Sequence, residues 1–428
     1  MNIAFYTLGC KVNQYETQVM REGFAALGHT PVPEGAPFEV AVINSCTVTA
    51  ESDRKTRQLF HKLRRENPNG VIVLTGCMVQ AFSDEAKAAC DADIIVGNTD
   101  VSKIITLTQR FLKDGKKIFE IAPHEKNEVF NTPNITDFAE RTRAYMKIED
   151  GCDRYCTYCI IPYARGFVRS KSRQDIYLEA ERLSQQGFSE LVLVGINLTS
   201  YGKDGGLDLC DAVEAVCSVE GIKRLRLGSL EPDHISDEML LRFKAQPKFC
   251  PQFHLSLQSG CDATLKRMNR HYDTAFYEDL VFRIRKMFPD AAITTDIMVG
   301  FAGETEEEFA ESLAFFKKMQ FARAHVFSYS RRKGTVAYNL PGQVSNSDKK
   351  LRSRILSAAA AEAEAEFLKA QCGKSVSVLF ETGEGDVYYG YTANYLRVCA
   401  QSEHDLCGKI AEVEILSAEK DYCIAKIN

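Results

Sequence analysis

The sequence predicts an α/β protein that ends in a small all-β barrel, and three observations lead to this prediction. From Met1 onward, strand-like and helix-like patterns alternate, as they do in units with a parallel sheet. Between residues 143 and 345 this alternation repeats about six times, as in a full or partial barrel; a doubly wound open sheet is the alternative, and the periodicity fits both. After residue 372, five short strands follow one another closely, as in a closed OB-like barrel.

Composition restricts the class of protein. The 428 residues are 45% hydrophobic and 26% charged, values typical of a water-soluble protein of two to four domains. No apolar run has the length of a membrane span, and the start at Met1 leads directly into a strand, so we expect a cytoplasmic protein that does not contact membranes. Fifteen cysteines then favour metal or cluster ligation over disulfides. The net charge of −5 restricts any nucleic-acid contact to local basic patches.

Three predicted strands of the N-terminal third each run into a cysteine. Strands 2–8, 38–44 and 71–75, with helices 14–27 and 52–66 between them, lead to Cys10, Cys46 and Cys77. The carboxyl ends of parallel strands share one edge of a sheet, so these thiols are expected to converge. Gly9 and Gly76 would allow the backbone to approach a bound cluster. Isolated buried cysteines are the alternative, and we expect Cys90 to be one.

A second set of three cysteines lies in the loop 151–162, directly after the predicted strand 144–148. Cys152, Cys156 and Cys159 are spaced by four and three residues. Thiolates are soft ligands that suit iron–sulfur clusters or zinc. A structural zinc ion needs four protein ligands, and no fourth cysteine or histidine follows nearby. Three thiolates on a four-iron cluster would leave one iron open; zinc or redox thiols remain the alternative.

The central and C-terminal regions follow a regular pattern of predicted elements. Residues 123–142 lack periodicity and are predicted to be a linker. The central strands are predicted at residues 144–148, 190–195, 224–230, 252–257, 292–299 and 325–329, with helices such as 175–186 and 304–318. A long helix is predicted over residues 347–369, and the C-terminal strands over 376–380, 387–392, 396–400, 410–417 and 422–427.

Basic and aromatic residues provide candidate contacts to an RNA. Three basic runs are candidate phosphate sites, with a solvated face as the alternative. They are Lys349, Lys350, Arg352 and Arg354 at the start of the predicted helix 347–369, residues 331–333, and Arg165, Arg169, Lys171 and Arg173. In the C-terminal barrel, the side chains expected to stack on bases or contact phosphate are those of Tyr391, Tyr395 and Arg397. Core packing is the alternative for the tyrosines.

The two cysteine sets carry a family resemblance. The loop 151–162 resembles the cluster loop of radical S-adenosylmethionine enzymes, and residues 7–16, 44–49 and 75–77 resemble the methylthiotransferases. Residues 10–14 and 227–232 are similar to the MtaB branch of that family, and residues 390–395 resemble a TRAM domain. The resemblance implies an N-terminal cluster domain (1–122), a linker (123–142), a partial (βα)6 radical domain (143–345), a connecting helix (346–371) and a TRAM domain (372–428).

The same resemblance implies the cofactors and their ligands. Cys152, Cys156 and Cys159 would hold a 4Fe–4S cluster that reduces S-adenosylmethionine to a 5′-deoxyadenosyl radical. Cys10, Cys46 and Cys77 would hold a second 4Fe–4S cluster that carries the sulfur. The S-adenosylmethionine contacts are expected from strand ends and from the aromatic beside the cluster, namely Tyr158, Asn197, Glu231, Gln258 and Gly300.

The implied activity is methylthiolation at C2 of N6-threonylcarbamoyladenosine at position 37 of tRNA, with an electron-donor protein as a further partner. Because the threonylcarbamoyl group adds a carboxylate, a cation is expected at the mouth of the barrel, and we expect it to be Arg332. Its neighbours Arg331 and Lys333 are alternatives for this role, and ordinary phosphate binding is the alternative function. The alternatives are the MiaB branch, which acts on isopentenyladenosine, the RimO branch, which acts on a ribosomal-protein aspartate, and a zinc-bearing RNA-binding protein without catalysis. The sequence leaves the oligomeric state open.

Overall fold

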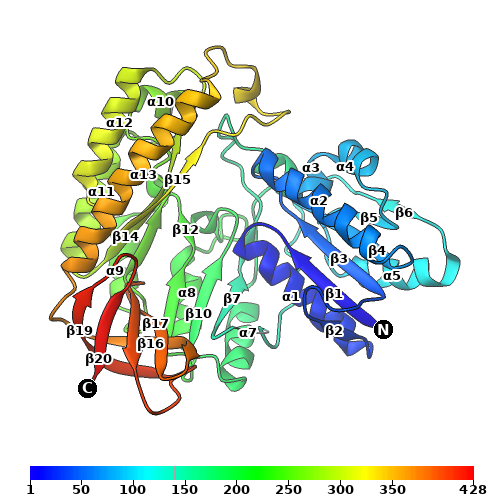
Figure 1. Ribbon diagram of the computed structural model, residues 1–428, viewed down its shortest axis with the longest axis horizontal. Coiled ribbons are helices and arrows are strands. Elements are labelled where there is room, and N and C mark those ends of the chain that lie inside the picture. Colours follow the sequence, from blue (N-terminus) through cyan, green and yellow to red (C-terminus); the bar gives the residue numbers. More distant parts are fainter. Residues whose placement is uncertain (139–140) are drawn as a thin grey trace.

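The computed structural model describes residues 1–138 and 141–428, and Figure 1 shows its three parts in order along the chain. An N-terminal α/β region (blue to cyan) lies beside a central region of parallel strands and helices (green to yellow), and a small β-barrel (orange to red) ends the chain. Residues 139 and 140, which belong to the predicted linker 123–142, lie outside the described residues. Among the helices that the structure describes, none is long and apolar enough to cross a lipid bilayer.

The N-terminal region is built on one parallel sheet with the strand order β2-β1-β3-β4-β5-β6. Its strands are β1 (Asn2–Thr7), β2 (Thr30–Val32), β3 (Val40–Ser45), β4 (Val71–Gly76), β5 (Ile94–Val96) and β6 (Ile118–Glu120). Its helices are α1 (Lys11–Ala26), α2 (Ala50–Glu66), α3 (Cys77–Ala81), α4 (Ser83–Ala89) and α5 (Lys103–Asp114).

Helices cover both faces of this sheet, which explains why β3 and β4 are buried along their whole length. On one face, Phe24 of α1 packs with Phe5 of β1, and on the other face Phe60 of α2 packs with Tyr6. The alternation of Phe5 and Tyr6 between the two cores follows from the two-residue period of a strand. The predicted linker lies along α1, where the Tyr15 hydroxyl donates a hydrogen bond to the Pro133 carbonyl (3.0 Å).

The central strands are neighbours in the same order in space as in the chain. They form the rows β11-β10-β7 and β12-β13-β14-β15, all parallel. A doubly wound sheet reverses its order partway, so this arrangement fits the predicted barrel and not the open-sheet alternative. The strands are β7 (Arg143–Lys147), β10 (Glu190–Val194), β11 (Arg224–Leu227), β12 (Ser229–Leu230), β13 (Gln252–Leu255), β14 (Ala292–Val299) and β15 (Arg323–Ser328).

The third strand, predicted as one segment over residues 224–230, is divided at Gly228. The amide of Gly228 still donates to the Leu193 carbonyl of β10 (2.8 Å), whereas Ser229 pairs with His254 of β13. The division therefore turns the strand from one row to the other, and the six strand positions curve into an open barrel. The short strands β8 (Glu149–Asp150) and β9 (Arg169–Ser170) pair with each other beside the cysteine loop.

Helices follow the central strands in turn. They are α6 (Ile161–Arg165), α7 (Arg173–Gln185), α8 (Leu209–Cys217), α9 (Asp237–Lys244), α10 (Asp262–Arg267), α11 (Thr274–Met287), α12 (Glu306–Met319) and α13 (Asn346–Lys369), with single 3-10 turns at Leu198–Ser200, Pro232–His234 and Val336–Asn339. Side-chain caps fix several starts; the Thr305 hydroxyl, for example, accepts from the Glu308 amide and forms a capping box at α12.

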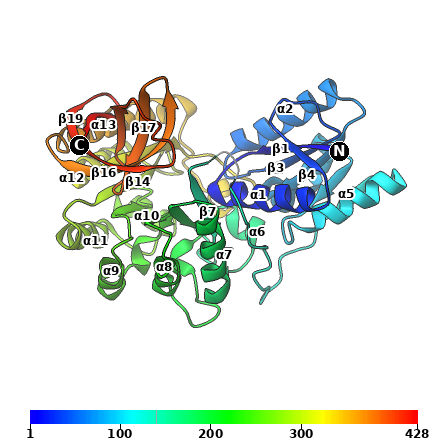
Figure 2. The same cartoon turned by 90° about the horizontal axis from the view of Figure 1, so that it is seen from below.

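The C-terminal strands close into a barrel in the order β16-β17-β18-β20-β19, as predicted. They are β16 (Ser375–Glu384), β17 (Val387–Thr392), β18 (Arg397–Gln401), β19 (Ile410–Ala418) and β20 (Cys423–Ile427). Two arginines of the central strand β11 hold this barrel in place: Arg224 donates to the Ser377 carbonyl (2.7 Å) and Arg226 to the Ala393 carbonyl (2.8 Å). Figure 2 shows the small barrel beside the central strands.

The basic runs considered as phosphate sites are largely buried. The Lys349 ammonium donates to the Tyr329 carbonyl (3.1 Å), and Arg352 forms a salt bridge with Glu304 (2.7 Å). Arg165, Arg169 and Lys171 are at most 3% exposed and pair with internal carboxylates. These five cations have internal partners and are not free to bind phosphate, whereas Lys350, Arg354 and Arg173 of the same runs are exposed.

Candidate functional site: two cysteine sites around one cavity

Three adjacent parallel strands bring Cys10, Cys46 and Cys77 together. Thr7 of β1 is the register partner of Asn44 of β3, and Asn44 is the partner of Thr75 of β4. Each cysteine follows its strand by a few residues, so the three thiols lie at the same edge of the sheet. Cys46 and Cys77 are buried and Cys10 is exposed.

Two glycines permit this approach. Gly9 and Gly76 have φ values of +102° and +96°, which favour glycine. A Cβ atom on Gly9 would lie 2.8 Å from the Cys46 sulfur, and one on Gly76 would lie 2.4 Å from the Ser45 carbonyl oxygen. Any larger residue would therefore push the strand ends apart and separate the thiols.

Asn13 and Arg165 connect this cysteine site to the central region. The Asn13 amide donates to the carbonyls of Leu8 (2.8 Å) and Ser45 (3.0 Å), and its oxygen accepts from Arg165 (2.7 Å). Arg165 also donates from Nε to the Cys77 sulfur (3.2 Å) and forms an ion pair with Glu16. Because Arg165 ends α6, directly after the second cysteine loop, one side chain connects the two cysteine sites.

The loop of Cys152, Cys156 and Cys159 is held by backbone contacts. Its first residue, Gly151, has φ +88°, and a Cβ atom there would lie 1.9 Å from the Phe167 carbonyl oxygen. The Cys152 amide donates to the Gly166 carbonyl and the Cys159 amide to the Cys156 carbonyl (both 2.9 Å). These contacts curl the chain and hold the three cysteines within one short loop.

A guanidinium lies beside a sulfur atom at each cysteine site, where its positive charge favours the thiolate form. Burial raises the pKa of the Cys77 thiol and that of the Cys159 thiol to about 12 each, and it raises the pKa of Cys152 above its ordinary value. Metal ligation requires thiolates, so cluster binding at either site releases protons. Arg270 lies within 3.4 Å of the Cys156 sulfur, as Arg165 lies near Cys77. Each site thus has one guanidinium that stabilises a thiolate.

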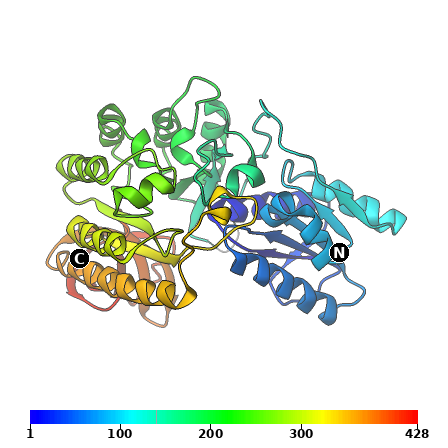
Figure 3. The same ribbon diagram turned by 90° about the horizontal axis from the view of Figure 1, so that it is seen from above.

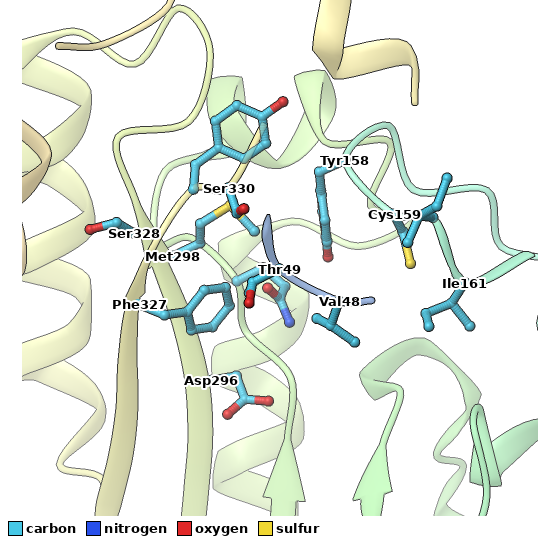
Figure 4. A pocket seen from close by; sticks show the side chains of 13 residues that line it. Val48, Thr49, Tyr158, Cys159, Ile161, Asp296, Met298, Phe327, Ser328 and Ser330 are labelled. Atoms are coloured by element: carbon cyan, nitrogen blue, oxygen red, sulfur yellow. The ribbon is translucent and has the colours of Figure 1, made fainter. Parts of the chain in front are cut away.

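A cavity of about 360 Å³, a size suited to a small ligand, is lined by Cys159 and by residues that closely follow Cys46. Figure 4 shows Tyr158 and Cys159 of the cysteine loop on one side and Met298 and Phe327 of β14 and β15 on the other. Val48, which follows Cys46 closely, lines it too. The cavity is therefore bounded by both cysteine-bearing regions and by the carboxyl ends of the barrel strands.

The predicted cofactor contacts divide into two groups. Tyr158 and Gln258 line the cavity, and the buried Oε1 of Gln258 has no hydrogen-bond partner among the described residues, so it is available to a ligand. Asn197 instead bonds to Ser200 (2.7 Å), and Glu231 pairs with Arg270. A Cβ atom on Gly300 would meet the Lys349 side chain at 2.4 Å, so this glycine serves helix packing and not the cavity.

Sequence reasoning missed several residues that line the cavity. Thr49, Met298, Phe327 and Ser330 contribute to its wall. Thr49 lies three residues after Cys46, a position that signals its presence at the site, whereas Met298 and Phe327 belong to strands whose inward side chains the sequence does not distinguish from core. The apolar rings and the thioether suit the adenine of a nucleoside ligand, and the Gln258 amide suits its polar groups.

Arg332 lies in the loop after β15, as predicted, but its charge is already matched. Its Nη2 atom donates to Asp53 Oδ2 and to the Thr47 hydroxyl (both 2.6 Å), and the side chain is 6% exposed. Its neighbour Lys333 pairs with Glu85 (3.0 Å). Figure 3 shows this loop, in gold, reaching the N-terminal region. Arg332 therefore joins two regions. Its neighbour Arg331 is exposed and, among the described residues, donates to the Tyr338 carbonyl (2.7 Å) and pairs with no carboxylate.

The candidate RNA-binding residues of the C-terminal barrel have different surroundings. The rings of Tyr391 and Tyr395 stack on each other (centroids 4.6 Å apart), and the Arg143 guanidinium lies over both, at 4.9 and 5.2 Å. Their faces are thus directed at the central barrel. Arg397 is partly exposed and pairs with Asp421 (2.9 Å).

Both cysteine sites suit a cluster better than one ion. Among residues 1–138 and 141–428, no group of three or more His, Cys, Asp or Glu side chains is arranged to hold a single metal ion. A cluster of several iron atoms is wider than one ion, so its thiolate ligands lie further apart. The three thiols, the guanidinium and the glycine-lined backbone at the N-terminal site suit such a cluster in their chemistry.

Comparison with known proteins agrees with this geometry. The Radical SAM superfamily matches residues 146–316, which implies a 4Fe–4S cluster and S-adenosylmethionine as cofactors, and Uncharacterized protein family UPF0004 matches residues 2–97. Threonylcarbamoyladenosine tRNA methylthiotransferase MtaB of Bacillus subtilis is 36% identical over 429 residues, covering 98% of this chain and 95% of the relative. The MtaB of Thermotoga maritima is 38% identical, covering 88% and 85%.

Other relatives and structures complete the comparison. A tRNA-2-methylthio-N(6)-dimethylallyladenosine synthase of Pelotomaculum thermopropionicum is 33% identical, covering 96% of this chain and 94% of the relative. The radical S-adenosylmethionine methyltransferase TsrM from Kitasatospora setae, at 13% identity, has a similar fold with a TM-score of 0.59 over 78% of this chain and 76% of that chain. These matches, together with the two cysteine sites, establish that the chain is a transferase that belongs to the radical S-adenosylmethionine methylthiotransferase family, in its MtaB branch.

Proposed function

We propose that this enzyme converts N6-threonylcarbamoyladenosine at position 37 of tRNA into its 2-methylthio derivative, using two 4Fe–4S clusters and S-adenosylmethionine. The observation that carries the proposal is the single cavity bounded by both cysteine-bearing regions. The proposed reaction needs a sulfur carrier and a radical source close to the same substrate atom. A cavity lined by residues of both cysteine-bearing regions supports such proximity. The names of the MtaB relatives support the threonylcarbamoyl substrate.

The net chemistry balances with two molecules of S-adenosylmethionine. One donates its methyl group to sulfide, which gives a methylthio group and S-adenosylhomocysteine. The other is cleaved to methionine and 5′-deoxyadenosine, which carries away the hydrogen of C2 as the C2–S bond forms. A 4Fe–4S cluster held by Cys152, Cys156 and Cys159 would supply the electron that starts this cleavage, after reduction by an electron-donor protein. Formation of the C2–S bond releases one electron again, so the transfer consumes no net electron. The sulfide must come from a sulfur donor.

The residues of this chain have separate tasks in the proposal. The ligands of the radical cluster are Cys152, Cys156 and Cys159, and those of the auxiliary cluster are Cys10, Cys46 and Cys77. Tyr158 and Gln258 contact S-adenosylmethionine, because both line the cavity. The other expected contacts do not line the cavity, and we propose an indirect role for Asn197, Glu231 and Gly300. Glu231, for example, orients Arg270, which in turn contacts Cys156. We also propose that the enzyme acts in the cytoplasm.

Nucleoside mass spectrometry tests the proposal. Deleting the gene should remove 2-methylthio-N6-threonylcarbamoyladenosine from cellular tRNA and leave its precursor in place. The purified, iron-loaded enzyme should convert a threonylcarbamoyl-modified anticodon stem-loop and leave an isopentenyl-modified one unchanged. The names of the 33% identical relatives favour the second substrate, so product from the isopentenyl RNA alone would refute the proposed substrate while retaining the reaction. Zinc in place of iron in the anaerobically purified protein would refute the reaction itself.

A further inference from the structure

A second cavity, of about 340 Å³, lies inside the barrel toward the beginnings of its strands. Asp296 of β14 lines both this cavity and the one between the cysteine sites, so the two adjoin. The start of α1 contributes Lys11, the residue after Cys10, and the C-terminal barrel contributes Tyr395. A substrate base held at the cysteine sites could therefore extend a substituent into this second cavity.

Positive charge predominates in the second cavity. Four cations from four strands or helices line it, namely Lys11, Arg143, Arg226 and Arg323. Asp296 is the only acidic residue among the described residues of the lining, and it faces His254 at 3.2 Å. The pKa of Tyr395 agrees with this excess of positive charge. Burial raises the pKa of its hydroxyl, but the nearby Arg143, Lys11 and Arg226 bring that pKa below its ordinary value.

The four cations differ in how far their charge is already matched. Arg226 pairs with Glu190 (3.0 Å) and Arg143 with Glu381 (2.5 Å), so both are fixed. The carboxylate of Glu364 is 3.7 Å from Arg323, whose side chain is half exposed. Lys11 is exposed and, within the described part of the chain, has no carboxylate within salt-bridge distance. Lys11 and Arg323 are thus the cations available to an anion from outside.

We propose that this cavity binds the carboxylate-bearing substituent of the target adenosine, with Lys11 and Arg323 as the residues that contact the carboxylate. The inference rests on the proposed function, since it assumes that the target base lies at the cysteine sites. A charged hydrogen bond in a partly buried site stabilises a carboxylate strongly. A hydrocarbon substituent would desolvate the same cations without replacing their water, so the cavity also disfavours an isopentenyl group. Arg332, with its charge matched by Asp53, does not serve this purpose.

Binding of modified RNAs tests this assignment in the iron-loaded, full-length enzyme. Three anticodon stem-loops are compared by fluorescence anisotropy at one salt concentration: one with threonylcarbamoyladenosine, one with its methyl ester and one with unmodified adenosine. The wild-type enzyme should bind the acid about tenfold more tightly than the ester, as expected for one charge-assisted contact. Lys11→Met and Arg323→Gln should each reduce this ratio toward one and leave the affinity for the ester unchanged.

The control is Lys116→Met, which removes an exposed lysine from the loop after α5; it should keep the wild-type ratio. If the cavity variants weaken the binding of all three RNAs equally, the two cations contact phosphate and the assignment is overturned. An unchanged ratio of the affinities for the acid and the ester would also overturn it. Arg323 is distant in sequence from every cysteine ligand, so it decides the outcome if Lys11→Met disturbs iron binding at Cys10. Failure of the proposed function is distinct: the wild-type enzyme would then form no methylthio product from the acid RNA, whatever the binding ratio.

Discussion

Gly151 is the residue on which the radical-cluster loop depends. A side chain there would meet the Phe167 carbonyl at 1.9 Å and would have to adopt φ +88°. We therefore expect Gly151→Ala to displace Cys152 and to lower the bound iron to about half, because thiolate ligation is local to each site. Iron per chain, measured after anaerobic reconstitution, checks this outcome.

A matched control separates crowding from backbone strain. Gly187 has a similar φ of +96°, but a Cβ atom there would meet nothing within 4 Å. Gly187→Ala should cost about 1 kcal/mol in unfolding free energy and leave the iron content unchanged. Similar iron loss in both variants would mean that strain, and not the contact with Phe167, controls the loop.

Glu149 gives a pH-dependent prediction. Burial raises the pKa of this carboxyl well above its ordinary value, and its Oε1 has no partner among the described residues. The unfolded chain releases this proton near the ordinary pKa and the folded chain only at higher pH, so Glu149 lowers stability as pH rises between the two values. In the iron-free protein, Glu149→Gln should raise the free energy of unfolding at pH 8 and have little effect at pH 4. Equal effects at both pH values would contradict the buried, protonated state.

Individual residues could be predicted where a motif fixes them. Cys10, Cys46 and Cys77 follow strand ends, and their convergence required only a parallel sheet. Gly300 and Arg332 were expected at the site because of their positions at strand ends, but Gly300 leaves room for the Lys349 side chain and Arg332 pairs with Asp53. Such contacts join residues far apart in the sequence, and no local pattern records them.

At the scale of elements, two independent supports hold the two cysteine sets. The first set of cysteines follows the ends of strands β1, β3 and β4. The second set lies in the loop between β8 and α6. Replacing Cys152, Cys156 and Cys159 with alanine should leave about half of the iron, and replacing Cys10, Cys46 and Cys77 should give the complementary half. The second variant should still cleave S-adenosylmethionine without transferring a methylthio group.

Iron analysis and Mössbauer spectroscopy of both variants measure this independence. Loss of all iron in either variant, with an unchanged circular dichroism spectrum, would contradict two separate sites.

The prediction of helices and strands succeeded where the periodicity was strong, as in β14 and β17, which have the predicted bounds. It missed β5 and β6, because strands of three residues carry too little pattern, and it joined β11 to β12 across Gly228.

At the scale of the whole molecule, the Arg332–Asp53 pair joins the barrel to the N-terminal region. Both side chains are nearly buried, so removing one partner leaves an unmatched charge. Arg332→Gln and Asp53→Asn should each destabilise the iron-free protein, and the double variant should show a coupling energy of about 1–3 kcal/mol in urea unfolding. Lys333→Met, in the same loop but with an exposed partner, should change stability by less than about 0.5 kcal/mol. Additive effects of the first two changes would mean that the pair does not join the regions.

The C-terminal barrel is also part of this connected structure. Arg224 and Arg226 donate to its carbonyl groups, and Tyr395 forms a wall of the second cavity. Deleting the residues after Gln371 should therefore weaken RNA binding and lower the thermal midpoint as well, since two buried guanidinium groups lose partners. Unchanged RNA affinity in the shortened chain would assign RNA binding to the central region alone.

The contact between Arg165 and Cys77 also bears on how the enzyme matures. The N-terminal region leaves the ribosome first, and until residue 165 is made, nothing from α6 covers the thiols of the N-terminal site. In the folded protein Cys46 and Cys77 are buried and Cys10 is exposed, and Arg165 of α6 contacts Cys77. A scaffold protein that hands over an assembled cluster then has one exposed thiol to approach. The period between synthesis of the N-terminal region and docking of α6 is thus the time at which cluster delivery meets the least obstruction.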